Sequence, residues 1–330
     1  MPRAFVTGAT GFVGHHVAAA LLNRGWSVSG LRRQSSVHPV QLPGIQWTIG
    51  DIRQPDQLAG VMEGADALFH VAADYRLWAR DPREIYESNV TGTKNILEAA
   101  LSAGIQTVVY TSSVGALGLN PDGTPADETA PVSFHDMIGH YKKSKFLAER
   151  EAEKFLQKGL RVVFVHPSTP VGPADHKPTP TGKIILDFLN RKMPAYINTG
   201  LNLVDVRDVA EGHCLACEKG RTGEKYILGN KNLALSDIFV LLEKISGLPA
   251  PRVRLPVTPI LCLAGLFHLL SFVTKREPLI PFEGVRMAKK LMFFDSTKAV
   301  RELGLPQTPV ETALADAVAW FGDNGYVSKK

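Results

Sequence analysis

The 330-residue chain has little cysteine. Its three cysteines, Cys214, Cys217 and Cys262, are too few for a disulfide framework and suit a reducing compartment, so we expect a cytoplasmic protein. The first two lie in an Ala- and Leu-bearing helical pattern, which favours buried small side chains over a redox or metal pair. We therefore expect no bound metal.

An excess of charge of one sign is also lacking. The chain carries 37 basic and 32 acidic residues, a net charge of +5, and the basic residues are spread along its length. Without a basic block, the composition gives no support for nucleic-acid binding. The mild positive charge suits an anionic cofactor or a small-molecule substrate.

No apolar run is long enough to span a bilayer. The most apolar stretch, 257–273, is interrupted by Pro259 and His268 and is shorter than the roughly 20 residues that a span requires. We expect a buried or capping helix. Four basic residues flank it: Arg252, Arg254, Lys275 and Arg276. They leave open a peripheral membrane contact or a lid over a lipophilic substrate. The N-terminus reads as a strand that leads into a glycine motif, not as a signal peptide.

The first 170 residues alternate short β-branched runs with helical patterns. This alternation predicts an α/β fold, a Rossmann-type doubly wound parallel sheet. The expected strands are 4–7, 26–31, 45–49, 65–70, 107–111 and 161–165. The expected helices here are 12–23 and a long one that opens with a capping box at Asp81.

After Pro167 prolines become frequent, and we expect the chain to leave the sheet. Residues 1–170 are predicted to form a dinucleotide-binding domain, to which 201–230 returns. Residues 171–200 and 231–330 would form a smaller α/β substrate lobe, intimately joined above the carboxyl ends of the strands, where open sheets bind ligands.

A glycine-rich turn follows the first predicted strand and opens the first helix. Gly8, Gly11 and Gly14 would allow a tight turn, close approach of a pyrophosphate and close packing of the helix on the sheet. We predict dinucleotide contacts here from Gly8, Thr10, Gly11, Phe12, Val13 and Gly14.

The end of the second strand indicates which dinucleotide binds. An acid there would bind the ribose hydroxyls of NAD, whereas this chain has Arg32, Arg33 and Ser35, which suit a 2′-phosphate. We therefore predict NADP(H) in preference to NAD(H). Further expected cofactor contacts follow the third and fourth strands: Asp51, Ile52, Val71, Ala72 and Ala73.

Tyr141 and Lys145 are four residues apart, on one face of a predicted helix. A phenol with a pKa near 10 is a poor acid–base group at neutral pH, and a nearby ammonium favours its ionised form. Lys145 could also bind the cofactor ribose. Ser113 follows the fifth strand, where a hydroxyl would lie beside a substrate oxygen. We predict that Ser113, Tyr141 and Lys145 are catalytic and that Thr111 borders the cofactor.

These motifs together resemble the extended short-chain dehydrogenase/reductase superfamily, the NAD-dependent epimerase/dehydratase family, over essentially the whole chain. The segments 70–82 and 177–182 look closest to the hopanoid-associated sugar epimerase group, a dihydroflavonol-4-reductase-like branch. The resemblance implies a Ser–Tyr–Lys triad at Ser113, Tyr141 and Lys145 and a cofactor contact from Pro167. It also implies a homodimer built on the helices around Asn89 and Tyr141, with Asn89 supporting the active-site helix.

The chain departs from the nucleotide-sugar epimerases at three positions. Leu201 replaces an Arg, Asp205 a His, and Thr169 an Asn of those enzymes. A diphosphate needs cationic donors, so this pattern favours an uncharged, small or lipophilic carbonyl substrate. The residues that could line its pocket, or could instead belong to the core, are Tyr75, Trp78, Tyr196, Phe134 and Met137. Asp74 could lie at the mouth of this pocket.

The main hypothesis is therefore an NADP(H)-dependent carbonyl reductase. A sugar epimerase or dehydratase that retains NAD is the alternative, since the same triad serves both reactions. A third reading is a non-catalytic protein that senses NADP. Net consumption of NADPH would distinguish the first from the other two.

Overall fold

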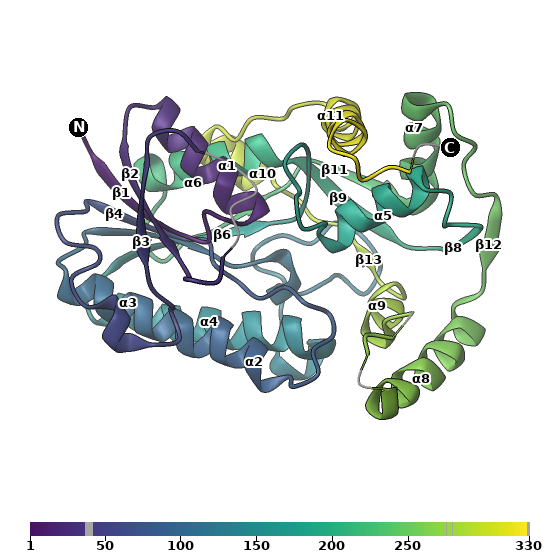
Figure 1. The fold of residues 1–330 in the computed structure, drawn as a ribbon, viewed down its shortest axis with the longest axis horizontal. Helices are drawn as coiled ribbons and strands as arrows, with labels where there is room; N and C mark the ends of the chain where they lie inside the picture. The colour runs from purple at the N-terminus through teal and green to yellow at the C-terminus, as the bar shows by residue number, and fades with distance from the viewer. Residues whose placement is uncertain (37–41, 275, 279, 329–330) are drawn as a thin grey trace.

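A seven-stranded sheet, parallel throughout, occupies one half of the molecule (Figure 1). The computed structural model describes residues 1–36, 42–274, 276–278 and 280–328. The strand order is β10-β6-β5-β4-β1-β2-β3, so the chain changes direction between β1 and β4, where such folds open a crevice for ligands. The strands are β1 Arg3–Thr7, β2 Ser27–Arg32, β3 Ile45–Ile49, β4 Ala67–His70, β5 Thr107–Thr111, β6 Arg161–Pro167 and β10 Lys225–Leu228. The predicted Rossmann-type fold is confirmed.

Helices cover both faces of this sheet. α1 (Phe12–Asn23) and α6 (Val206–Lys219) pack on one face, and α3 (Gly92–Ser102) and α4 (Gly139–Gln157) on the other (Figure 1). Successive strand residues point to opposite faces. Val6 therefore belongs to the first core and Phe5 to the second, and both are fully buried. This explains why the strands read as continuous apolar runs.

A second sheet lies beside the first. Its order is β11-β9-β13, with β7 also paired to β9. These strands are β7 Thr169–Val171, β9 Gly200–Asp205, β11 Lys231–Ala234 and β13 Leu291–Met292. A further hydrophobic core packs against them, built with α5 Pro180–Leu189, α7 Leu235–Ser246 and α11 Val310–Asp323.

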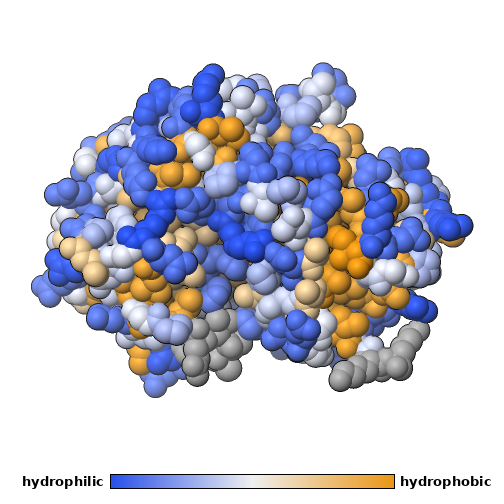
Figure 2. Space-filling model, turned by 90° about the horizontal axis from the view of Figure 1, so that it is seen from above, coloured by the Kyte–Doolittle hydropathy of each residue, from blue (hydrophilic) through white to orange (hydrophobic). Residues whose placement is uncertain are grey.

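The remaining elements lie at the periphery. β12 (Val253–Leu255) pairs with β8 (Ala195–Ile197), α10 (Thr297–Leu303) contacts α6, and α8 (Val257–Thr274) packs on α9 (Phe282–Met287). The expected burial of α8 holds for one face only, because several of its leucines are exposed. Among the described residues no helix has the length and apolarity needed to cross a membrane. Figure 2 shows, on the face seen from above, a mostly hydrophilic surface with apolar residues gathered in patches.

The long helix predicted after Asp81 is divided. α2 (Arg83–Tyr86) runs into a π-helical turn, η2 (Glu87–Thr91), before α3 begins. Asp81 accepts a hydrogen bond from the Arg83 N–H, but Glu84 pairs with Arg76 and does not complete a capping box. Three 3₁₀ turns complete the fold: η1 Pro55–Leu58, η3 Val114–Ala116 and η4 Phe134–Asp136.

Gly14 holds α1 against the turn that precedes it. A Cβ at this position would lie 2.1 Å from the carbonyl oxygen of Gly8, so the backbone itself would have to move. We expect Gly14→Ala to lower the free energy of unfolding by about 3 kcal/mol, measured by urea denaturation. The control is Gly322→Ala in α11, where a Cβ meets nothing within 4 Å and should stabilise the helix by about 0.5 kcal/mol. Equal effects of the two changes would contradict this account.

Candidate active site

The turn between β1 and α1 is open to an anion. Gly8 has φ +77°, and a Cβ there would lie 2.7 Å from the backbone nitrogen of Ala72. A Cβ on Gly11, in contrast, would meet only the Gly8 carbonyl oxygen, at 3.3 Å. No side chain caps α1, so its first N–H groups are available to a ligand. The residues present therefore fit a dinucleotide pyrophosphate, with Thr10, Phe12 and Val13 at the same turn.

A buried chain of hydrogen bonds holds the loop after β4 against this turn. The Thr7 hydroxyl accepts from the Ala72 N–H at 3.2 Å and bonds Nδ1 of His70 at 2.7 Å. Nε2 of His70 bonds the Thr93 hydroxyl at 3.1 Å. Burial lowers the pKa of His70 to about 3, so the ring is neutral and each nitrogen has one partner. Val71, Ala72 and Ala73 are thereby placed beside the glycine turn.

The carboxyl ends of β2 and β3 border a pocket of about 780 Å³. Most of the residues that line it have polar side chains: Arg33, Gln34, Ser35, Ile49, Gly50, Asp51, Arg53, Gln54 and Gln57. Arg33 and Ser35 thus lie where the sequence placed them. Arg32 is not among the lining residues, and its Nε is buried with no hydrogen-bond partner in the described part of the chain.

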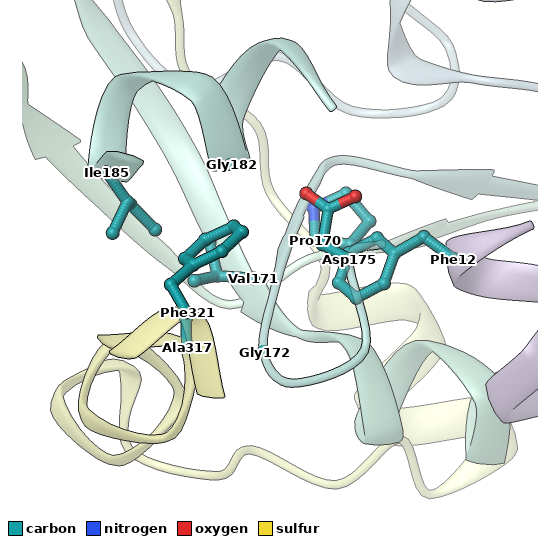
Figure 3. A pocket seen from close by; sticks show the side chains of 9 residues that line it. All are labelled: Phe12, Pro170, Val171, Gly172, Asp175, Gly182, Ile185, Ala317 and Phe321. Atoms are coloured by element: carbon teal, nitrogen blue, oxygen red, sulfur yellow. The ribbon is translucent and has the colours of Figure 1, made fainter. Parts of the chain in front are cut away.

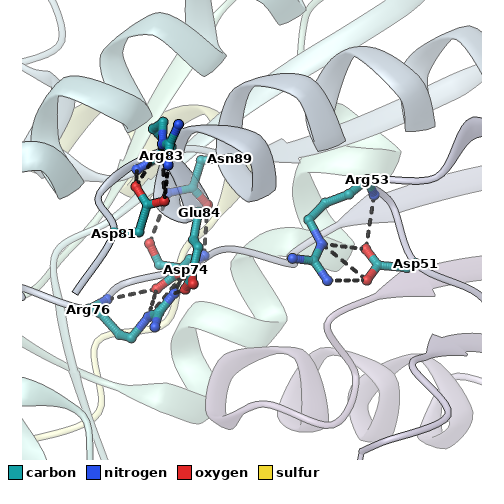
Figure 4. A network of polar contacts seen from close by, with 8 residues as sticks. All are labelled: Asp51, Arg53, Asp74, Arg76, Asp81, Arg83, Glu84 and Asn89. Atoms are coloured by element: carbon teal, nitrogen blue, oxygen red, sulfur yellow. Dashed lines mark hydrogen bonds and ion pairs between the residues drawn. The ribbon is translucent and has the colours of Figure 1, made fainter. Parts of the chain in front are cut away.

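Arg53 is a pocket residue that sequence reasoning missed. Its Nε lies 3.0 and 3.1 Å from the two oxygens of Asp51, and its Nη2 lies 2.6 Å from Oδ2 (Figure 4). This pairing lowers the pKa of Asp51 and occupies a carboxylate that was expected to contact the cofactor. The side chain of Ile52 packs against Gly92. The pocket at the ends of β2 and β3 therefore contains two guanidinium groups, those of Arg33 and Arg53.

Ser113, Tyr141 and Lys145 come together at the carboxyl end of β5. α4 carries Tyr141 and Lys145 one turn apart, and Ser113 follows β5 at the start of η3. The Ser113 hydroxyl accepts a hydrogen bond from the Gly115 N–H at 3.0 Å, and its proximity favours ionisation of the Tyr141 phenol by lowering the pKa of that group. The ammonium of Lys145 donates to the carbonyl of Thr111 at 2.7 Å. Pro167 ends β6, the strand next to β5.

Burial is the main cause of the pKa shifts of Tyr141 and Lys145. It raises the pKa of Tyr141, although the nearby Ser113 hydroxyl acts in the opposite direction. Burial also lowers the pKa of Lys145 to about 8, although the carboxylate of Glu149 opposes this. At neutral pH the phenol of Tyr141 is therefore protonated and Lys145 is charged.

Asn89 ties the loop after β4 to the helix that carries Tyr141. It lies in the π-helical turn, and its Nδ2 donates to the Asp74 carbonyl at 2.9 Å and to the Ser144 hydroxyl at 2.8 Å. Ser144 in turn donates to the Tyr141 carbonyl at 2.7 Å. The carboxylate of Asp74 pairs with Arg76 (Figure 4). Asn89 therefore supports the active-site helix, as the resemblance implied.

The other candidate substrate residues differ in placement. Tyr75 is half-buried, donates to the Lys177 carbonyl at 3.2 Å, and has its pKa raised to about 12 by burial. Trp78 is half-buried in the same loop. Tyr196 packs its ring against Phe239, 5.6 Å between centroids, beside the core of the second sheet. Packing therefore accounts for Tyr196 without a substrate contact.

A buried acid, Asp175, lies between the two halves of the chain. It lines a pocket with Phe12 of the glycine turn and Phe321 of α11 (Figure 3). Thr179 donates to it from its N–H and its hydroxyl, yet burial raises the pKa of Asp175 to about 6. Neither its burial nor its contacts could be read from the sequence.

The three residues that differ from the sugar epimerases lie in or at the ends of strands of the second sheet. Thr169 and Leu201 lie in β7 and β9. Asp205 is fully buried, and it accepts hydrogen bonds from the N–H and the guanidinium of Arg207. Arg207 therefore compensates the charge of Asp205. Leu201 still supplies no cation.

A buried polar cluster adjoins Lys145 and was not predicted. The carboxylate of Glu149, one helical turn after Lys145, accepts hydrogen bonds from the Ser112 hydroxyl and the Lys225 ammonium, and lies 2.8 Å from Nε2 of His166. Burial opposes its charge, but His166 and Lys225 hold the pKa of Glu149 well below its usual range. Its partners come from β6, from β10 and from the residue that follows β5, so no local pattern reveals them.

Comparison with known proteins places this site in a family. The model of the NAD dependent epimerase/dehydratase family matches residues 4–229. The chain belongs to this family. It is 50% identical to a "Putative dihydroflavonol 4-reductase" of Synechocystis, over 98% of this chain and 95% of that one.

Two further relatives agree. Sterol demethylase protein B of Methylococcus capsulatus is 35% identical, covering 98% of this chain and 99% of its own length. A solved structure, that of gox2253, matches with a TM-score of 0.89 and 47% identity, covering 99% of this chain and all of that one. The protein is thus an NAD(P)-dependent enzyme of the extended short-chain dehydrogenase/reductase type.

The Glu149 cluster generates a prediction about stability. The pKa of Glu149 is lower in the folded protein than in the unfolded chain, where it lies near 4.5. The ionised carboxylate therefore stabilises the folded protein above pH 4.5, and this stabilisation is lost as the pH falls below that value. We expect Glu149→Gln to lower the free energy of unfolding by about 3 kcal/mol at pH 7, because Lys225 and His166 lose a buried partner. Urea titrations of both proteins should show this difference shrinking below pH 4.5.

Glu153→Gln is the matched control, since Glu153 also bonds Lys225 but is partly exposed. Its effect should stay below about 1 kcal/mol. A difference for Glu149→Gln that is independent of pH would rule out the ionised cluster.

Proposed function

We propose that the protein is an NADP(H)-dependent reductase of an uncharged carbonyl compound. The observation that carries this proposal is the convergence of three side chains at the carboxyl end of β5: Ser113 follows that strand, and α4 carries Tyr141 and the buried ammonium of Lys145 one helical turn apart. The raised pKa of Tyr141 keeps the phenol protonated, which suits a group that gives a proton to a substrate oxygen.

The chain's own residues handle the proton. Ser113 donates a hydrogen bond to the carbonyl oxygen and so stabilises the negative charge that develops there. Tyr141 donates its proton to that oxygen. Lys145, fixed by the Thr111 carbonyl, places a positive charge near the phenolate that remains. NADPH, when bound, supplies the hydride.

The pocket at the ends of β2 and β3 supports the choice of NADP(H). Arg33 and Arg53 provide guanidinium donors and Ser35 a hydroxyl, which suit a 2′-phosphate. Asp51, the acid that lines this pocket, is already paired with Arg53.

The substrate lobe supports an uncharged substrate. Leu201 offers no cation to a diphosphate, and the guanidinium of Arg207 is held by Asp205 and Asp316. We assign cofactor binding to 1–170 with 201–230, and substrate binding to 171–200 and 231–330. We further propose that the protein is a cytoplasmic homodimer built on the helices around Asn89 and Tyr141, and that 257–273 makes a peripheral membrane contact.

One alternative rests on the family itself, which is named for epimerases and dehydratases. Such an enzyme would retain NAD and show no net redox change. Protein purified with tightly bound NAD, with no consumption of NADPH on any carbonyl compound, would favour it over the reductase.

Tyr141→Phe tests the proton donor. With a panel of lipophilic ketones and aldehydes, we expect NADPH oxidation to fall by at least about 100-fold, because the general acid is lost. Tyr326→Phe is the control, since its hydroxyl only donates to the His176 carbonyl at 2.7 Å. Substantial turnover in Tyr141→Phe would remove Tyr141 from the mechanism.

Cofactor choice is tested at the pocket. Arg33→Ala should weaken NADP(H) binding about tenfold or more and leave NAD(H) nearly unchanged, because one charge-assisted hydrogen bond to the phosphate is lost. Arg53→Ala should weaken NADP(H) binding in the same way, because a second guanidinium of the pocket is lost. Arg301→Ala, which removes an exposed guanidinium of α10, is the control. Calorimetric titration with both cofactors measures each effect, and equal losses for NADP(H) and NAD(H) would refute the preference.

A further inference from the structure

α8 presents an unusual face to solvent. Its 18 residues, Val257–Thr274, contain no charged side chain. Leu263, Leu266, Leu269 and Leu270 are 40%, 54%, 66% and 47% exposed. Their spacing of three and four residues places them on one side of the helix. The exposed leucines therefore form a continuous apolar stripe.

The opposite side of α8 is already occupied. Ala264 is fully buried, and the ring of His268 stacks on Phe282 of α9 with centroids 5.7 Å apart. α8 and α9 together project from one corner of the molecule (Figure 1). The side of α8 that packs on the rest of the protein is therefore the one opposite the stripe. An exposed apolar surface of this kind indicates a binding partner.

The charges around the stripe indicate what that partner is. Residues 251–282 contain four basic residues and one acid, Glu277. Arg252, Arg254 and Arg276 are exposed at the two ends of α8, and none has an ion pair among the described residues. Lys275 lies outside the described residues. An uncharged apolar stripe between basic ends matches a bilayer with anionic headgroups, since leucines enter the acyl boundary and arginines meet the phosphates.

The helix on which α8 packs, α9, adjoins the candidate active site. A Cβ on Gly139, the first residue of α4, would lie 3.2 Å from Cγ of Glu283 in α9. Tyr141 follows two residues later. A Cβ on Gly284 would lie 4.0 Å from Leu77, in the loop that carries Tyr75 and Trp78. α9 therefore borders the elements that hold the candidate substrate residues, and α8 reaches them through α9.

We propose that α8 and its flanking arginines dock the enzyme on an anionic lipid surface, so that a lipophilic carbonyl substrate enters the site from the bilayer. The evidence for docking is the stripe of exposed leucines on α8 and the arginines at the two ends of this helix. The route of entry rests, in addition, on the proposed function.

Flotation with lipid vesicles tests the docking. The full-length protein is mixed with vesicles of phosphatidylcholine alone or of phosphatidylcholine and phosphatidylglycerol. We expect at least about tenfold tighter binding to the anionic vesicles, reduced by high salt. The double variant L266E/L269E, and separately R252S/R254S, should each lower this binding about tenfold or more. The control V240E/V300E changes exposed apolar residues of α7 and α10 and should bind like the unchanged protein.

Several outcomes would overturn the docking. These are absence of binding to both kinds of vesicle, equal loss in V240E/V300E, or sedimentation showing that L266E/L269E only dissociates a dimer, which would make the stripe a contact between copies. An unchanged unfolding midpoint and NADP(H) affinity identify a folded variant.

The route of entry has its own readout. L266E/L269E should raise KM for a carbonyl substrate dissolved in vesicles and leave KM for a water-soluble one unchanged; an equal effect on both would refute the route. Vesicle binding without NADPH oxidation would refute the proposed function and spare the docking. NADPH oxidation without vesicle binding would do the reverse.

Discussion

Lys145 carries an ammonium group into the interior of the protein, where its charge has to be compensated. The Thr111 carbonyl binds it directly, and Glu149, one turn further along α4, supplies an opposite charge. Glu149 is itself buried and is held by groups from three neighbouring strands. The position of α4 over the ends of β5, β6 and β10 is thereby fixed by charge as well as by apolar packing. Removing any one of these partners would leave a buried charge uncompensated.

The same helix is anchored on its other side by Asn89. This residue lies in a π-helical turn, a feature often found near functional sites, and links the backbone of Asp74 to Ser144 beside Tyr141. The loop after β4 is also bound to the glycine turn through Thr7 and His70. The glycine turn, the loop after β4 and the helix that carries Tyr141 are therefore connected by hydrogen bonds, and the pocket with Arg33 and Arg53 lies at the carboxyl ends of β2 and β3.

Much of this could be predicted from the sequence, because the signals are local. The glycine turn, the strand periodicity and the four-residue spacing of Tyr141 and Lys145 need only neighbouring residues to be interpreted. The missed features depend on residues far apart in the chain. Glu149 meets Lys225 on β10, and Tyr196 packs on Phe239 of α7. Arg207 neutralises Asp205 and also reaches Asp316. Arg53 lies only two residues after Asp51, but its place in the pocket depends on the folded ends of β2 and β3 and could not be inferred from this spacing.

The central claim is that the frame around Lys145 supports net transfer of a hydride from NADPH to a carbonyl carbon. The most direct measurement uses NADPH labelled with deuterium at the transferable position, a lipophilic ketone and mass spectrometry of the product. The account predicts an alcohol that carries the deuterium on its carbinol carbon, with NADP⁺ formed in equal amount. A product without the label, or a substrate isomerised while the cofactor remains bound and unchanged, would contradict it.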